Sequence, residues 1–488
     1  MDRAGPTGRR LPGVRTPDDP TGSPMTPPPS ESPWTRRRGL RRLRVAWRRA
    51  FRPRPIAPEE LPDIMRKHIY TGAMGNVWAS LVTGLFFVVF GNAVGMDPWL
   101  WGVMSSISSF ALVGQLFSSW LTQRVKRRKL VWFVNALAAR VVRYVTILLA
   151  VAFYQPGSKT AASILIVGTC LCNLFGALSA PPWMSWLADL IPERQHGGFW
   201  GRRASWIDAA VGLSIIPTGL LVDRVPEAWK LVALLGVFTG ATAVGIVDLL
   251  IHNTLPEPPM ARPSEAHYFR HLAMPLRDRA FRPWLTFNFC WTFGMTFGGA
   301  LSLVFFTDQL GIRKNLFGGN IVLTLIPIVG GILVGSKSGK LVDKLGAKPV
   351  LWWGHLFWAL LPGLWLFASP GTAMFWLTVQ GIISGTASRA ATTAANKLVT
   401  RFPAPQDVQV YSAVSSCVAS MASGLGCLAG GYLLRLLAGW ELHVWGITFI
   451  GFHVLFVVSL ALRLASALCL IRPILETRRP APPVSTAG

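Results

Sequence analysis

Twelve apolar stretches, each close to the length of a membrane-spanning helix, limit most strongly how this chain can fold. About 20 apolar residues suffice for a helix to cross a bilayer. Hydrocarbon offers the backbone no hydrogen-bond partners, so a spanning segment satisfies its N–H and C=O groups within its own helix. Only 14% of the residues are charged, against about 25% in a soluble protein. The sequence therefore predicts an all-α polytopic membrane protein. The stretches cover residues 70–95, 99–121, 130–153, 161–190, 205–222, 229–251, 284–306, 317–336, 350–368, 372–396, 408–434 and 443–470.

A short basic turn joins the eighth and ninth stretches, and a related turn joins the second and third. The later turn, Gly339–Pro349, reads G-K-L-V-D-K-L-G-A-K-P, and the earlier one, Ser119–Lys129, reads S-W-L-T-Q-R-V-K-R-R-K. Overlaying Asp343 on Gln123 gives an offset of 220 residues. Two halves with the same turn in the same place predict an internal repeat of six helices.

The spacing G-x-x-x-D-[RK]-x-G-x-[RK] resembles the loop signature of the major facilitator superfamily (MFS). The second copy matches it well, whereas in the first copy Ser119, Gln123 and Lys126 replace the first glycine, the acid and the second glycine. A second inner-loop pattern, Asp189–Arg194 followed by Gly198–Arg203, is also similar to bacterial members. The resemblance covers roughly residues 65–472, and it indicates no subfamily.

The resemblance implies twelve transmembrane helices in two pseudo-symmetric six-helix bundles that work by alternating access. It also implies that Asp343 approaches the inner end of the fifth helix, at Arg202 and Arg203, when the transporter is closed to the cytoplasm. The residues assigned to gating and to the loop motif are Gly339, Asp343, Lys344, Gly346, Lys348, Arg124, Arg127, Arg202 and Arg203.

Lysine and arginine are distributed unevenly between alternate loops. The loops on the side of the basic turns carry 19 of them, and the loops on the other side carry six. Positive residues gather on the cytoplasmic side of membrane proteins. The bias predicts a multi-pass protein of the plasma (inner) membrane with both termini in the cytoplasm.

The polar segments outside the stretches define five expected parts. Residues 1–64 form a disordered basic tail, in which 36–51 has the spacing of an amphipathic helix that would bind anionic lipid; an unstructured arginine-rich tail is the alternative. Residues 65–251 and 284–472 form the two bundles, 252–283 a cytoplasmic linker, and 473–488 a disordered tail.

Polar side chains on the first, seventh and tenth stretches suggest where a solute binds. Arg389 lies on a stretch that the family places beside the central cavity, so it could hold an anionic or amphipathic solute. Arg140 and Arg143 share a face of the third stretch near mid-membrane. They are either anion-binding or structural, and the peripheral place of that helix in the family favours a structural role. The expected cavity residues are Asn76, Thr83, Asn288, Trp291, Gln380 and Arg389.

No catalytic residue, metal site or cofactor is expected. The six cysteines lie in apolar stretches without a C-x-x-C partner, and no nucleophile or acid–base pair marks a membrane enzyme, the alternative class. The positive charge follows the pattern of membrane orientation rather than nucleic-acid binding. The sequence thus predicts a transporter of a small solute that acts as a monomer, with a lipid or glycolipid flippase on the same fold as the alternative.

Overall fold

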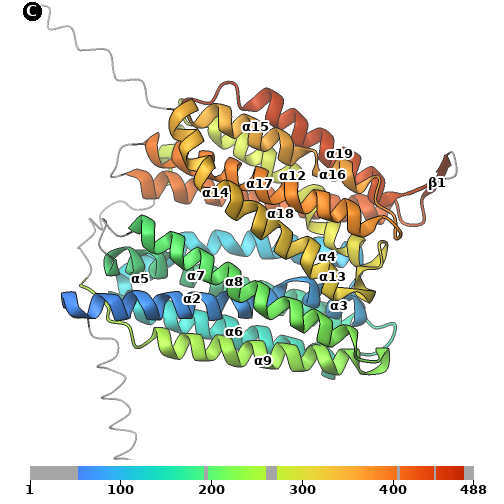
Figure 1. Cartoon of the computed structure of the whole chain (residues 1–488), viewed down its shortest axis with the longest axis horizontal. Coiled ribbons are helices and arrows are strands. Elements are labelled where there is room, and N and C mark those ends of the chain that lie inside the picture. Colours follow the sequence, from blue (N-terminus) through green and yellow to red (C-terminus); the bar gives the residue numbers. More distant parts are fainter. Residues whose placement is uncertain (1–52, 192–195, 260–271, 404–406, 445–446, 477–488) are drawn as a thin grey trace, which may run out of the picture. The chain divides into compact units, whose positions relative to one another are not determined.

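The computed structural model describes residues 53–191, 196–259, 272–403, 407–444 and 447–476. By its internal contacts the chain divides into residues 1–49 and 50–488, and every described residue belongs to the second unit. The basic segment 36–51 and its expected lipid contact therefore lie outside the described residues. Figure 1 shows long, closely packed helices, with the blue-to-green helices of the first half gathered together and the yellow-to-red helices of the second half gathered together.

The first half contains six spans, two of which are interrupted. Gly84 separates α2 from α3, and a 3₁₀ turn at Leu112–Gly114 separates α4 from α5. A long intact helix forms each of the other four spans. The helices are α2 (Leu61–Thr83), α3 (Leu85–Ala93), α4 (Pro98–Ala111), α5 (Gln115–Val125), α6 (Arg128–Ala152), α7 (Thr160–Leu190), α8 (His196–Asp223) and α9 (Lys230–His252).

The second half repeats this order with more irregular spans. A π-helical segment, Ile321–Leu325, joins α13 to α14, and a second one, Ser466–Leu470, ends the last span. The helices are α11 (Met274–Arg277), α12 (Arg282–Asp308), α13 (Leu316–Asn320), α14 (Ile326–Leu345), α15 (Ala347–Ala359), α16 (Leu361–Trp365), α17 (Ala373–Arg401), α18 (Val408–Leu436) and α19 (Gly451–Ala465).

Ten helical segments of the described chain are long and apolar enough to cross a membrane. The expected ninth span is broken at Leu360 into α15 and α16, and the expected tenth, α17, has the length but a more polar composition. The all-α membrane class is confirmed, whereas the count of twelve spans stays a prediction.

Two boundaries differ from those expected from the sequence. The first helix begins at Leu61 rather than near residue 70, with Pro62 in its first turn, where a missing N–H costs nothing. The last span begins at Gly451 rather than 443, because β1 (Glu441–Val444) pairs antiparallel with β2 (Ile447–Ile450). The apolar residues of β2 continue the hydropathy of the helix that follows, so composition alone could not separate them.

The repeat is visible in the backbone of the two basic turns. Lys126 has φ 56° and is the one non-glycine residue with positive φ among the described residues. Gly346, 220 positions later, has φ 92°. The left-handed conformation strains a side chain but not glycine. Lys126 therefore occupies the place of the second motif glycine, as the alignment of the two turns predicted.

We expect Lys126→Gly to stabilise the protein by about 1 kcal/mol, because glycine adopts this conformation without strain. Lys126→Ala is the matched control and should gain little, since alanine keeps the Cβ. The measurement is the unfolding free energy of both variants in micelles. Equal stabilisation by alanine and glycine would show that loss of the lysine charge, not relief of backbone strain, is responsible.

Candidate functional site

For orientation, the motif end denotes the end of the helices that carries the two basic turns, and the far end denotes the opposite one. Several hydrogen bonds join the first and second halves at the far end and midway along the helices. Midway, Ser109 of α4 and Ser423 of α18 are 2.9 Å apart. Gly102 and Gly431 let the same two helices touch, since an added Cβ on Gly102 would lie 2.8 Å from Gly431 Cα.

Asp223 makes the strongest of the far-end contacts. Its two carboxylate oxygens accept the N–H groups of Leu316 (2.9 Å) and Phe317 (2.8 Å) at the start of α13. A carboxylate is stabilised at the positive start of a helix. Close by, Asn92 donates to Asp308 at 2.9 Å. The far end is thus closed by charge-assisted contacts between the halves.

Arg389 of α17 and Asp208 of α8 come from different halves and act on each other electrostatically. The Arg389 guanidinium lies beside α14: a Cβ added to Gly331 of that helix would be 3.3 Å from Arg389 Nε. An added Cβ on Gly212 would be 3.5 Å from Leu325. Since α8 and α14 run in opposite directions, Asp208, one turn before Gly212, lies at about the depth of Gly331. An acid of the first half and a base of the second half therefore lie near each other.

The structure divides the other expected cavity residues into two groups. Asn76 and Thr83 are exposed on α2 and donate to the carbonyls of Gly72 and Ala79 in their own helix. By contrast, Asn288 donates to the Ser415 carbonyl of α18 at 2.8 Å and joins two helices of the second half.

Trp291 and Gln380 lie inside the packing of the second half. Trp291 is 4% exposed and meets the His355 ring edge-on at 4.4 Å between centroids. Gln380 is 8% exposed, and its Oε1 has no hydrogen-bond partner among the described residues. Asn76, Thr83 and Arg389 are thus the expected cavity residues whose side chains a solute could reach in this arrangement.

Two of the motif residues have partners within their own halves. The Asp343 carboxylate bonds Lys397 Nζ of α17 at 2.6 Å. Arg203 lies over the Trp183 ring at 5.2 Å and against Gly72 of α2. The latch between Asp343 and the start of α8 was expected for the state closed at the motif end, and it stays a prediction. The other motif residues, Gly339, Lys344, Arg124, Arg127 and Arg202, lie on open or partly exposed surface.

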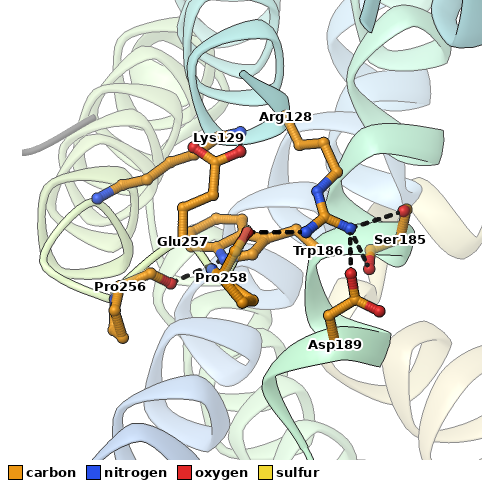
Figure 2. Close-up of polar contacts among 8 residues, drawn as sticks. All are labelled: Arg128, Lys129, Ser185, Trp186, Asp189, Pro256, Glu257 and Pro258. Atoms are coloured by element: carbon orange, nitrogen blue, oxygen red, sulfur yellow. Dashed lines mark hydrogen bonds and ion pairs between the residues drawn. The ribbon is translucent and has the colours of Figure 1, made fainter. Parts of the chain in front are cut away.

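Arg128 and Lys129, the last residues of the first turn, anchor the chain that follows α9. Figure 2 shows the Arg128 guanidinium between the Pro258 carbonyl and the side chains of α7. It donates to Asp189 at 2.5 Å, to Ser185 and to Pro258, although Arg128 is only 2% exposed. Lys129 donates its backbone N–H to Glu257 Oε1 at 3.3 Å and its Nζ to the Leu255 carbonyl at 2.8 Å.

The second half contains the same anchor. Lys348 donates its backbone N–H to Glu476 Oε1 at 2.7 Å and its Nζ to the Arg472 carbonyl. Lys348 and Glu476 each lie 219 positions after Lys129 and Glu257. In both halves, an acid beyond the sixth span thus caps the start of the third. Burial raises the pKa of the Glu257 carboxyl. The backbone N–H groups of Lys129 and Arg128 stabilise the carboxylate and so partly offset this rise in pKa.

Arg140 and Arg143 both have partners inside the first half. Arg140 Nη2 bonds Asp248 Oδ2 of α9 at 2.5 Å and lies over the Trp78 ring at 4.6 Å. Arg143 donates to Thr169 of α7 at 2.7 Å and lies over Phe87. These contacts favour a structural role for both arginines. The acid partner, Asp248, lies 108 positions after Arg140 in the sequence.

No protein-family model matches this sequence, and no curated protein matches it. Solved structures do match its fold. The chain is similar to a mutant form of the nucleoside transporter NupG, with a TM-score of 0.63 and 13% identity over 84% of this chain and 100% of that one. The bacterial homologue of the human lysosomal transporter Spinster, inward-facing and unoccupied, gives 0.59 and 14% over 87% and 100%.

The xylose transporter XylE from E. coli, in an inward-open conformation, gives a TM-score of 0.60 and 14% identity over 85% of this chain and 96% of that one. These matches extend over nearly the whole helical region. They show that this polytopic membrane protein shares the fold of those three structures. More specifically, the chain has the fold of the major facilitator superfamily, as the basic turns predicted, while its subfamily is not resolved.

Proposed function

We propose that this protein moves a small solute across the plasma (inner) membrane by alternating access of two six-helix bundles, residues 65–251 and 284–472. The observation that carries the proposal is the position of the contacts between the halves. Asp223 and Asn92 close the far end, and Arg389 and Asp208, one from each half, lie near each other on the motif-end side of these contacts. The proposed orientation puts the motif end and both termini in the cytoplasm, in line with the loop charges.

The charges beside the proposed site define the class of solute. An exposed guanidinium on α17 binds carboxylate or phosphate groups through paired hydrogen bonds. Asp208 on the facing helix adds an acceptor for a hydroxyl or ammonium group. We therefore expect a small anionic or zwitterionic solute carrying hydrogen-bonding groups. A lipid or glycolipid substrate is the second candidate, because Trp206 and Tyr70 are exposed beside Arg66 and Arg202, around a groove of about 620 Å³.

Ligand-induced thermal stabilisation of the purified protein, across a panel of metabolites and lipids, tests the proposal. For a small anionic hit, we expect Arg389→Ala to weaken binding by about tenfold to a hundredfold, the scale of a charged hydrogen bond. Arg389→Lys should retain part of the affinity. Arg313→Ala, which removes an exposed arginine at the far end, is the matched control.

Flux of the hit into proteoliposomes then separates transport from binding alone. Undiminished binding by Arg389→Ala would remove Arg389 from the site. Stabilisation by lipids alone, with no response to soluble anions, would favour the flippase alternative.

A further inference from the structure

Two histidines face each other inside the first half, close to the motif end. His68 of α2 and His252 of α9 are 0% and 3% exposed, and their ring centroids are 4.5 Å apart at an interplanar angle of 77°. Both nitrogens of His68 and Nε2 of His252 lack a hydrogen-bond partner among the described residues. A fully buried imidazole usually has its nitrogens satisfied, so the pair requires an explanation.

Aromatic rings enclose the pair. Trp132, Trp186 and Trp183 lie 4.5, 5.3 and 6.5 Å from the His252 ring, and Phe199 meets His68 at 5.9 Å. These rings seal the histidines from the surrounding medium without offering them an acceptor or a donor. The rings meet edge to face without a hydrogen bond between them. A proton is the ligand that two such imidazoles can hold together once one ring turns a nitrogen toward the other.

The charged groups that face the pair come from three helices. Arg203 of α8 acts on both rings, while Arg140 and Lys129 of α6 act on His252. Asp248 lies one turn before His252 on α9 and bonds Arg140. α2 and α7 face the rings with aromatic and apolar side chains. Three cations therefore oppose a positive charge on the rings in this arrangement.

Arg203 connects the pair to the transport cycle. It lies at the motif-end start of α8, against Gly72, where an added Cβ would be 2.6 Å from its Nη2. The other end of the same helix holds Asp223, which closes the far end. A change of access that shifts α8 against α2 and α9 therefore also moves a cation relative to the two rings.

We propose that His68 and His252 share one proton in the state in which Arg203 has moved away from them, so that proton binding is coupled to the change of access. The proton comes from solution at the motif end, bonds to a nitrogen of one ring and is hydrogen-bonded by a nitrogen of the other. No other bond forms or breaks. The bound proton replaces the charge of Arg203, and so it favours the state closed at the motif end. This inference rests on the proposed alternating access and adds a coupling ion to it.

Electron–electron distance measurements test the coupling. Spin labels at Lys126→Cys and Lys344→Cys, on a background without the six native cysteines, report the separation of the halves at the motif end. Between pH 8.5 and 5.5 we expect the ratio of short to long distances to rise by up to about tenfold per pH unit, the limit for one proton. His68→Gln and His252→Gln should each abolish this dependence. His355→Gln is the control, because His355 is also buried, in the second half, but bonds the Leu351 carbonyl.

Each outcome has one meaning. Two distance populations that do not respond to pH, or glutamine variants that titrate like the wild type, would overturn the proton pair while leaving alternating access intact. A single population under all conditions would instead contradict the proposed function. If the variants do not fold, ¹⁵N spectra of histidine in the wild-type protein decide the matter: two coupled imidazoles must titrate together, and the absence of such a pair excludes the shared proton.

Discussion

Replacing Asp248 by asparagine is expected to lower the free energy of unfolding by about 3–5 kcal/mol, the usual cost of removing one partner of a buried ion pair. The side chains of Arg140 and Asp248 are only 10% and 6% exposed. The asparagine variant would leave the Arg140 guanidinium inside the bundle without its compensating charge. A charge at that place lacks both water and a counter-ion.

The measurement is the unfolding free energy in bicelles, with Asp63→Asn as the control. Asp63 is also an acid of a membrane helix paired with cations, but its side chain is 44% exposed, so its loss should cost under about 1 kcal/mol. The double variant Asp248→Asn with Arg140→Met should recover much of the loss, because it removes the unpaired charge as well. A double variant as unstable as the single one would show that packing, rather than charge, sets the cost.

Asp223→Asn is expected to open the far end. The amide keeps one acceptor oxygen and loses the charge, so one of the two N–H groups at the start of α13 is left without its carboxylate. At about 2 kcal/mol for a charged hydrogen bond, the population closed at the far end should fall about thirtyfold relative to the alternative. Spin labels on the far-end loops, at Lys159→Cys and Arg313→Cys, measure the change directly.

Asp308→Asn is the matched control for the gate. Asp308 accepts from Asn92 and is another acid at the far end, but the donor is a neutral side chain rather than the start of a helix. Its variant should shift the distances less. An equal shift in both variants would mean that net charge at the far end, and not the capping of α13, controls the closure.

The sequence predicts the helical plan well because each part of that plan is local. Hydropathy locates most of the spans, and the two basic turns indicate the repeat, in which Lys126 stands at the place of a motif glycine. The sequence could not predict the ion pair of Arg140 with Asp248. These residues lie 108 positions apart, and no periodicity indicates which helices are neighbours. For the same reason His68 and His252 look ordinary until the fold packs their rings edge to face.

Among the expected cavity residues, Trp291 shows the limit of residue type as a guide. A tryptophan on a cavity-lining helix suits a solute site, yet here its ring packs on His355 and Trp358 within one half. Both placements use the same helix and differ only by its rotation. The gating motif has a similar limit, since the sequence indicates which residues gate but not the state in which each contact forms.

The anchors at Arg128 and Lys129 have a consequence for the segment that connects the halves. Arg128 holds Pro258, and the Tyr411 hydroxyl holds Asp278 at 2.6 Å on the other side. Twenty residue steps separate these two points. The connection is thus fastened to the first half at one end and to the second half at the other. Each anchor therefore moves with its own half, and a substitution that breaks one anchor should disturb that half without loosening the other.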